Sequence, residues 1–128
     1  MNIIGIDKMF RLGIIEESLE SLDTLALLAP FFFSQRISEV PEETPPVWHI
    51  NEYHVPDDKI VDLLPTLEQQ VKPTWYIHAF NDERLVVILR EKSFFISPHK
   101  DETWDEMVAY GESVNVERRF LENIPLAV

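Results

Sequence analysis

The sequence predicts a single α+β domain, with a ferredoxin-like βαββαβ core extended by a β-hairpin and C-terminal helices. Its 128 residues are enough for one hydrophobic core and leave little room for two. Short apolar runs typical of strands alternate with longer stretches whose apolar residues recur every three or four positions, as in helices. The first six elements follow in the order strand, helix, strand, strand, helix, strand, which is the order of the ferredoxin-like unit. We therefore expect one domain over residues 1–128.

The first strand and the first helix are expected at residues 10–15 and between Ser18 and Pro30. Residues 10–15 are bulky, apolar and bounded by charge, which favours a buried strand. After Ser18 the apolar residues recur at helical spacing and predict one buried stripe. Pro30 is expected to end the helix, because its ring clashes with the preceding turn. The stripe consists of Leu19, Leu22, Leu25 and Ala26.

A second and a third strand are expected at residues 31–37 and 47–55. Residues 39–46 between them contain three prolines and three glutamates, so we interpret them as a solvated connection. The third strand mixes aromatic, β-branched and polar residues, which is typical of a strand with one face in water. In the second strand, the residues expected to share one face are Phe31, Phe33 and Ile37.

A second helix is predicted after Pro56. Asp57 and Asp58 stand where a helix needs an N-cap and negative charge. Pro65 lies inside this helix and costs about 3 kcal/mol there, so we expect a kink or a restarted turn. The buried stripe of the helix consists of Ile60, Leu63, Leu64, Leu67 and Val71.

Three further strands are predicted at residues 74–80, 85–89 and 93–96, joined by tight turns as a meander. Residues 85–89 are apolar on both faces, so both faces of this strand need cover. We expect a second subunit to supply part of that cover.

Two helices complete the chain. Thr103 and Glu106 have the spacing of a capping box at the start of the first one. Gly111 is expected near its end, and Asn115 is expected to cap the last short helix.

The predicted sheet has a definite centre. In the ferredoxin-like order, the strand at residues 10–15 lies between the strands at 47–55 and 74–80. Both early helices then cover one face of the sheet, and the C-terminal helices cover part of the other.

The chain is acidic and contains no cysteine. It has 23 Asp and Glu against 11 Lys and Arg, a formal net charge of −12. This charge repels phosphate backbones and anionic membranes, so we expect neither nucleic acid nor a membrane as partner. The lack of cysteine excludes disulfides, thiolate metal sites and thiol nucleophiles. Three glycines do not suffice for a phosphate-binding loop. Acidic residues within the first 30 positions argue against a signal peptide, so we expect a cytoplasmic protein.

The most promising polar cluster lies at residues 49–54, with His78 on another strand. Alternation places Glu52 and His54 on one face of the strand and His49 on the other. Glu52, His54 and His78 are the candidate catalytic or metal-binding residues. The strand predicted between them places the two histidines roughly 10 Å apart, which disfavours a shared ion. We therefore predict no metal ion and no cofactor, and interpret these histidines first as hydrogen-bonded side chains on half-exposed strands.

Aromatic residues on the predicted strands suggest stacking surfaces. Base stacking, as on RNA-binding sheets, also needs Lys and Arg for the phosphates, and residues 37–58 contain none. We therefore expect packing in the core or at an interface. The aromatic residues concerned are Trp48, Trp75, Tyr76 and Phe80.

Four stretches of the chain carry a resemblance: WHINEYHVP at 48–56, WYIHAFND at 75–82, DETW at 101–104 and AYG at 109–111. They resemble a family of small uncharacterised bacterial and archaeal proteins, over a region from about Phe10 to the end. The resemblance implies a small cytoplasmic protein. It implies no activity and transfers no catalytic residue.

The missing catalytic motifs, the apolar strand and the aromatic sheet faces together predict a non-enzymatic binding module. We expect a homodimer that binds a small ligand or a protein partner. The alternative is a small metal-dependent or His/Glu acid–base enzyme of the hydrolase type, using Glu52, His54 and His78. A third hypothesis, motivated by the net charge, is an acidic inhibitor that binds a basic protein.

Overall fold

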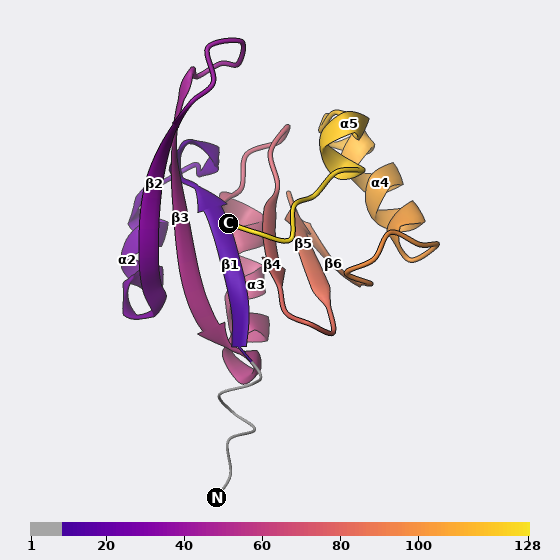
Figure 1. Cartoon of the computed structure of the whole chain (residues 1–128), viewed down its shortest axis with the longest axis horizontal. Helices are drawn as coiled ribbons and strands as arrows, with labels where there is room; N and C mark the ends of the chain where they lie inside the picture. Colours follow the sequence, from indigo (N-terminus) through magenta and orange to yellow (C-terminus); the bar gives the residue numbers. More distant parts are fainter. Residues whose placement is uncertain (1–8) are drawn as a thin grey trace, which may run out of the picture.

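The computed structural model describes residues 9–128, a mixed α+β structure built on one six-stranded antiparallel sheet (Figure 1). The strand order is β2-β3-β1-β4-β5-β6. The strands are β1 (Met9–Ile15), β2 (Phe32–Glu39), β3 (Val47–Pro56), β4 (Ile77–Phe80), β5 (Leu85–Leu89) and β6 (Lys92–Ile96). The helices are η1 (Glu16–Ser18), α2 (Asp23–Leu28), η2 (Ala29–Phe31), α3 (Asp57–Gln70), α4 (Trp104–Ser113) and α5 (Arg118–Leu121).

Strand β1 lies at the centre, paired with β3 on one side and with β4 on the other. The expected neighbours of the first strand are therefore confirmed. Within residues 9–128, no helix has both the length and the apolar character needed to cross a membrane.

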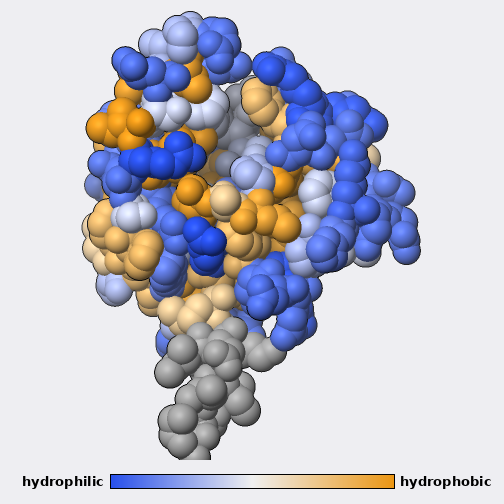
Figure 2. Space-filling view, in the orientation of Figure 1, coloured by the Kyte–Doolittle hydropathy of each residue, from blue (hydrophilic) through white to orange (hydrophobic). Residues whose placement is uncertain are grey.

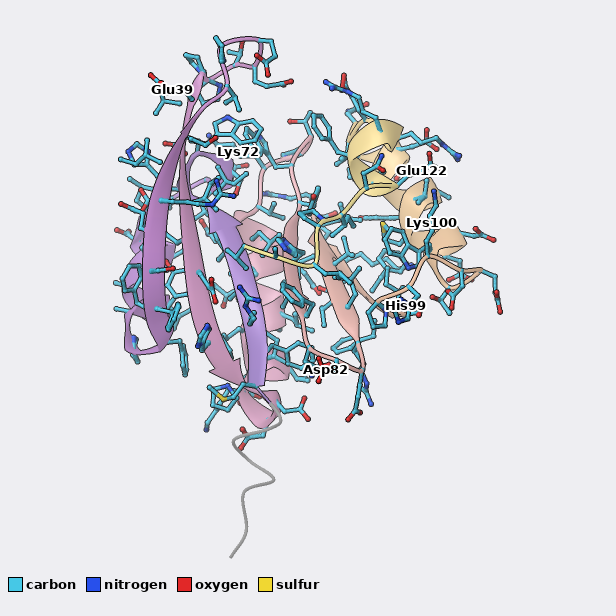
Figure 3. The ribbon with its side chains drawn as sticks, viewed as in Figure 1. Glu39, Lys72, Asp82, His99, Lys100 and Glu122 are labelled. Carbon is cyan, nitrogen blue, oxygen red and sulfur yellow. The ribbon has the colours of Figure 1, made fainter. Side chains whose placement is uncertain are left out.

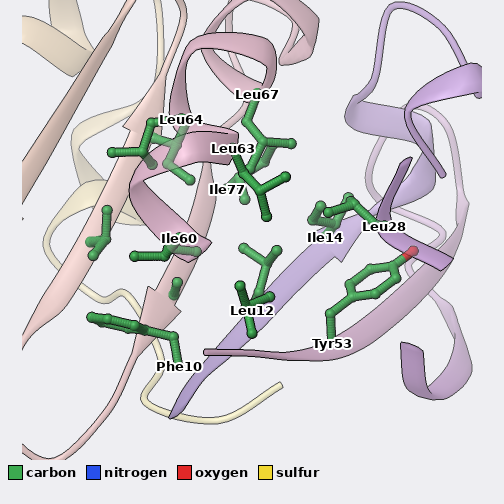
Figure 4. Close-up of a cluster of buried hydrophobic side chains, with 14 of the residues drawn as sticks. Phe10, Leu12, Ile14, Leu28, Tyr53, Ile60, Leu63, Leu64, Leu67 and Ile77 are labelled. Atoms are coloured by element: carbon green, nitrogen blue, oxygen red, sulfur yellow. The ribbon is translucent and has the colours of Figure 1, made fainter. Parts of the chain in front are cut away.

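One face of the sheet is covered by α2 and α3 (Figure 1). Alternate residues of β1 point toward this face, and the apolar stripe of α3 packs on them, as the sequence predicts. Figure 4 shows this cluster, in which Tyr53 of β3 also lies. Its labelled members from β1 and α3 are Phe10, Leu12, Ile14, Ile60, Leu63, Leu64 and Leu67.

The other face is covered by α4 and α5 over β4, β5 and β6. All five residues of β5 are fully buried, because α3 covers one side of the strand and the C-terminal helices cover the other. The expectation that a second subunit covers residues 85–89 is therefore wrong. The two helices approach closely, since a Cβ added to Gly111 of α4 would lie 2.7 Å from Leu121 Cδ1 of α5.

The same face is only thinly covered over β1, β3 and β2. There the C-terminal segment, residues 125–128, runs from α5 toward β1 (Figure 1). It is held by a hydrogen bond that His78 Nε2 donates to the Ala127 carbonyl, at 3.2 Å. This half-covered face is where the candidate site lies.

The first helix differs from the prediction. Residues 18–20 pair with the end of α3 instead: Leu19 bridges Val71, and Lys72 N donates to the Ser18 carbonyl at 2.8 Å. The helix begins only at Asp23, so its register changes and Leu22 is 60% exposed while Leu28 is fully buried. Helix α2 does end before Pro30, at Leu28, and Pro30 lies in the first turn of η2, where a missing N–H costs nothing.

Strand β2 also differs from its prediction. Phe31 belongs to η2, and a register shift between Phe32 and Ser34 marks a bulge in the strand. A bulge changes the alternation, so Phe33 stacks on His54 while Ile37, opposite His49, faces the other side. The three residues expected to share a face do not.

Helices α3 and α4 begin where the sequence predicts, but their capping and the effect of Pro65 differ from the prediction. Helix α3 runs without a restarted turn through Pro65, which is exposed, and Pro56 takes the N-cap position, with Asp57 and Asp58 in the first turn. Thr103 takes the N-cap position of α4, as predicted, but its side chain makes no capping hydrogen bond. Its hydroxyl accepts from Ser97 N and donates to Asp101 Oδ1 instead.

The boundaries around α5 and β4 shift as well. Asn115 adopts a left-handed backbone (φ 69°) at the end of α4, and Glu117 takes the N-cap position of α5. Residues 74–76 precede β4 and are not part of it. The side chains of Trp75 and Tyr76 therefore need not point to alternate faces of the sheet.

The buried face of α2 gives a direct test of the fold. We expect Leu28→Ala to lower the free energy of unfolding by about 2–5 kcal/mol, because it removes a fully buried side chain. Leu22→Ala, which the sequence pattern treats as equivalent, should change it by less than about 0.5 kcal/mol. Urea denaturation of both variants measures this, and equal losses would contradict the register of α2.

Candidate functional site

A cavity of about 440 Å³ lies on the half-covered sheet face. Its floor comes from β1, β3 and β4, and its walls come from the β2–β3 hairpin end, residues 74–76, α5 and the C-terminal segment. Figure 2 shows the hollow between the hairpin end and the helices. The volume falls within the range of about 300–1,000 Å³ typical of small-molecule sites.

Aromatic side chains form much of the wall. Trp48 and Trp75 meet edge to face, with ring centroids 5.3 Å apart and planes at 66°. The Trp48 indole is fixed by a hydrogen bond from its Nε1 to the Pro45 carbonyl, at 2.9 Å. Tyr76 and Phe120 line the cavity beside them. The expected packing against the core is confirmed for Trp75, Tyr76 and Phe80. Trp48, Trp75 and Tyr76 also line the cavity, which the sequence does not predict.

Gly13 and His78 meet on the cavity floor, on adjacent strands. A Cβ added to Gly13 would lie 2.8 Å from His78 Cε1 and 3.2 Å from Val128 Cγ1. Only glycine lets the imidazole and the C-terminal segment lie this close to β1.

His78 is a neutral imidazole with a defined tautomer. Burial, together with the nearby charge of Arg11, lowers the pKa of His78 to about 4, although the hydrogen bond to the Ala127 carbonyl opposes the shift. Because a carbonyl only accepts hydrogen bonds, Nε2 carries the proton and Nδ1 is left as an acceptor. The ring also stacks on Phe80, with planes at 5° and centroids 5.9 Å apart.

Few charged side chains of residues 9–128 lie at the cavity, and some of them are paired while Arg36 is not. Arg119 joins the hairpin to α5, with Nη2 3.4 Å from Glu43 and Nε 2.7 Å from Glu117. Arg36 also lines the cavity, and no acceptor within residues 9–128 contacts its guanidinium. Other charged side chains labelled in Figure 3, such as Asp82, Lys100 and Glu122, lie at the periphery of the molecule.

Two of the three candidates from the sequence, Glu52 and His54, do meet. His54 Nε2 lies 2.5 Å from Glu52 Oε2, and Arg11 donates to the same carboxylate from Nε at 3.0 Å and Nη2 at 3.3 Å. Burial raises the pKa of Glu52, but the hydrogen bonds from Arg11 and His54 outweigh it and hold the pKa below its usual value. Glu52 is thus a paired carboxylate, and neither it nor His54 lines the cavity.

His78 does not join Glu52 and His54. Gly13 lies opposite Glu52 on one side and opposite His78 on the other, so a full strand separates them. Among residues 9–128, no three His, Asp or Glu side chains are grouped closely enough to hold a metal ion.

His49 lies on the opposite face of β3 from Glu52 and His54, the face covered by α2 and α3, as alternation predicts. Its Nδ1 lies 2.6 Å from Glu17 Oε2, and its backbone N–H donates to Glu17 Oε1 at 2.8 Å. The side-chain hydrogen bond to Glu17 raises the pKa of His49. The two contacts with Glu17 connect η1 to β3, so His49 has a structural role.

Comparisons with known proteins identify no relative of this chain. No family model matches it, and neither the curated proteins nor the solved structures include a match. The resemblance to a family of uncharacterised proteins finds no support in these comparisons.

Sequence reasoning missed most of the cavity. Nothing in the sequence marks Arg36 or Gly13, because their places in the cavity depend on strand pairing. Arg36 pairs with Ile50 of β3, and Gly13 pairs with His78 of β4. One signal was available for the wall, since Trp48 and Trp75 each adjoin a proline-containing turn.

The buried imidazole makes stability depend on pH. The unfolded chain protonates His78 near its ordinary pKa of 6.5, whereas the folded protein protonates it only near pH 4. The unfolded state therefore binds more protons in this window, and stability is lost as pH falls through it. We expect His78 to contribute a loss of roughly 2 kcal/mol between pH 7 and pH 5.

Denaturation at both pH values checks this contribution. His78→Gln, whose amide can still donate to the Ala127 carbonyl, should lose correspondingly less stability than the unmodified protein. His99→Gln, in the loop before α4 (Figure 3), is the control and should follow the unmodified protein. Parallel losses in all three proteins would show that His78 is not buried as a neutral ring.

Proposed function

We propose that the protein is a non-enzymatic binding module whose cavity takes a small, flat, largely apolar molecule. One observation carries this proposal: a cavity of about 440 Å³ walled by the indoles of Trp48 and Trp75 and by Tyr76 and Phe120. Preformed apolar concavities with a few polar groups are the usual form of small-molecule sites. Aromatic walls favour a flat ligand, because rings pack well face to face or edge to face.

The polar groups of the cavity support binding more than catalysis. His78 is neutral, with one nitrogen bound to a carbonyl, and Glu43 and Glu117 are held by Arg119. No base within residues 9–128 is paired with a nucleophile at this cavity.

We also infer that the first six strands and helices form a ferredoxin-like core, with β5 and β6 as its hairpin extension. The support is the chain order β1, α2, β2, β3, α3, β4 together with the sheet order β2-β3-β1-β4. In this arrangement the face away from α2 and α3 is free for a ligand.

N-phenyl-1-naphthylamine, a neutral dye whose fluorescence rises in apolar surroundings, tests the proposed function. We expect saturable binding that Trp75→Ala weakens roughly tenfold, since loss of one aromatic contact costs more than about 1 kcal/mol at such sites. Phe95→Ala, an exposed aromatic on β6, is the control and should leave binding unchanged. Absence of saturable binding, or equal binding by both variants, would contradict the proposal.

A second candidate is the acid–base enzyme that the sequence suggests, now limited to Glu52 and His54. The observation favouring it is their 2.5 Å contact, with Phe33 stacked on the imidazole at 4.0 Å. It ranks second because Arg11 already occupies the Glu52 carboxylate and the cavity lies elsewhere. Hydrolysis of p-nitrophenyl acetate that disappears in both Glu52→Gln and His54→Gln would support it, and equal rates in all three proteins would exclude this activity.

The homodimer and the cytoplasmic location stay predictions. The reason given for the dimer, an uncovered strand at residues 85–89, is removed because helices of the same chain cover it. Sedimentation of the purified protein decides the oligomeric state.

A further inference from the structure

Arg36 differs from the other arginines of residues 9–128 in having no partner. Arg11, Arg90, Arg118 and Arg119 each contact a carboxylate, and Arg84 lies over the Phe95 ring. The Arg36 guanidinium contacts neither a carboxylate nor an aromatic ring of residues 9–128, although the chain carries 23 acidic residues against 11 basic ones. In so acidic a protein, an unpaired guanidinium is the unusual arrangement.

The position of Arg36 explains why the acids do not reach it. It lies in β2 opposite Ile50 of β3, on the half-covered face, and lines the cavity. The two glutamates of the cavity, Glu43 and Glu117, are both engaged with Arg119. Arg36 therefore offers five free N–H donors at the edge of an aromatic-walled cavity.

We propose that the cavity takes a planar aromatic monocarboxylic acid, with its carboxylate on Arg36 and its ring against Trp48 and Trp75. This proposal rests on the proposed function of the same cavity and adds the chemical class of the ligand. A guanidinium matches a carboxylate with two parallel hydrogen bonds, which fixes orientation as well as affinity. The indole edges and faces supply the apolar contact.

The charge count favours one carboxylate over a phosphate. Arg36 is the single unpaired cation lining the cavity within residues 9–128, and Glu43 and Glu117 stand nearby. A phosphate monoester carries nearly two negative charges at pH 7, so one of them would face these glutamates without a partner. A monocarboxylate is neutralised by Arg36 alone.

Three probes that share one ring system separate the possibilities by isothermal titration calorimetry at pH 7. They are 2-naphthoate, the neutral 2-naphthamide and 2-naphthyl phosphate. We expect naphthoate to bind about tenfold more tightly than naphthamide, the lower end of the range for a hydrogen bond to a charged group, because Arg36 is exposed. Naphthyl phosphate should bind more weakly than naphthoate.

Variants assign the preference to Arg36. Arg36→Gln should make naphthoate and naphthamide bind equally, and Arg36→Lys should keep only part of the preference, because an ammonium lacks the two-pronged geometry. Lys59→Gln makes the same charge change on α3, away from the cavity, and should leave the preference intact.

The contradicting outcomes distinguish this proposal from the proposed function. Equal binding of naphthoate and naphthamide by the unmodified protein would overturn the acid as ligand. An undiminished preference in Arg36→Gln would overturn Arg36 as the partner of the carboxylate. Both outcomes leave the cavity as a binding site. Tighter binding of naphthyl phosphate than of naphthoate would overturn the monocarboxylate. Failure of all three probes to bind would overturn this proposal and the proposed function together.

Discussion

The packing of α4 and α5 on the sheet is the constraint on which the rest of the structure depends. Helix α4 has 10 residues and α5 has 4, so the longer one spans only about 15 Å at 1.5 Å per residue. Six strands at about 4.8 Å spacing make a sheet about 24 Å wide, and the two helices pack only on its β4, β5 and β6 side. The helices bury the face of β5 and leave the face of β1, β3 and β2 to the C-terminal segment. The cavity is the space that remains between them.

The positions of charge follow from the same arrangement. Ion pairs such as Arg119 with Glu117 and Arg118 with Glu122 lie at exposed sites, where each contributes little to stability. On the half-covered face, Glu52 is tightly paired with Arg11 and His54, whereas Arg36 contacts no acid of the described residues. The net charge of −12 therefore says less about a partner than the single guanidinium that none of the described acids neutralises.

Much of the fold was predictable from local pattern. The apolar stripe of α3, the fully apolar strand at 85–89 and the alternation that separates His49 from Glu52 and His54 all follow from periodicity, and all are confirmed. The failures arise where a contact distant in sequence overrides the pattern. Leu19 bridges Val71 and so delays α2, and the bulge next to Phe33 changes the alternation of β2.

The site was predictable only in part, because its members come from separate segments. The meeting of Glu52 and His54 follows from two-residue spacing on one strand, but their third partner, Arg11, comes from the neighbouring strand through register. The cavity joins a hairpin end, the residues before β4, α5 and the C-terminal segment. No sequence pattern predicts that these four segments are neighbours, because their proximity depends on where the short helices α4 and α5 end.

A crystal structure of the protein soaked with 2-naphthoate tests the central claim, that the half-covered face holds a preformed site for a flat aromatic acid, most directly. The account predicts the ring in the cavity beside Trp48 and Trp75, with the carboxylate on the Arg36 guanidinium. A cavity closed by its own side chains, or naphthoate bound only at another surface, would contradict it.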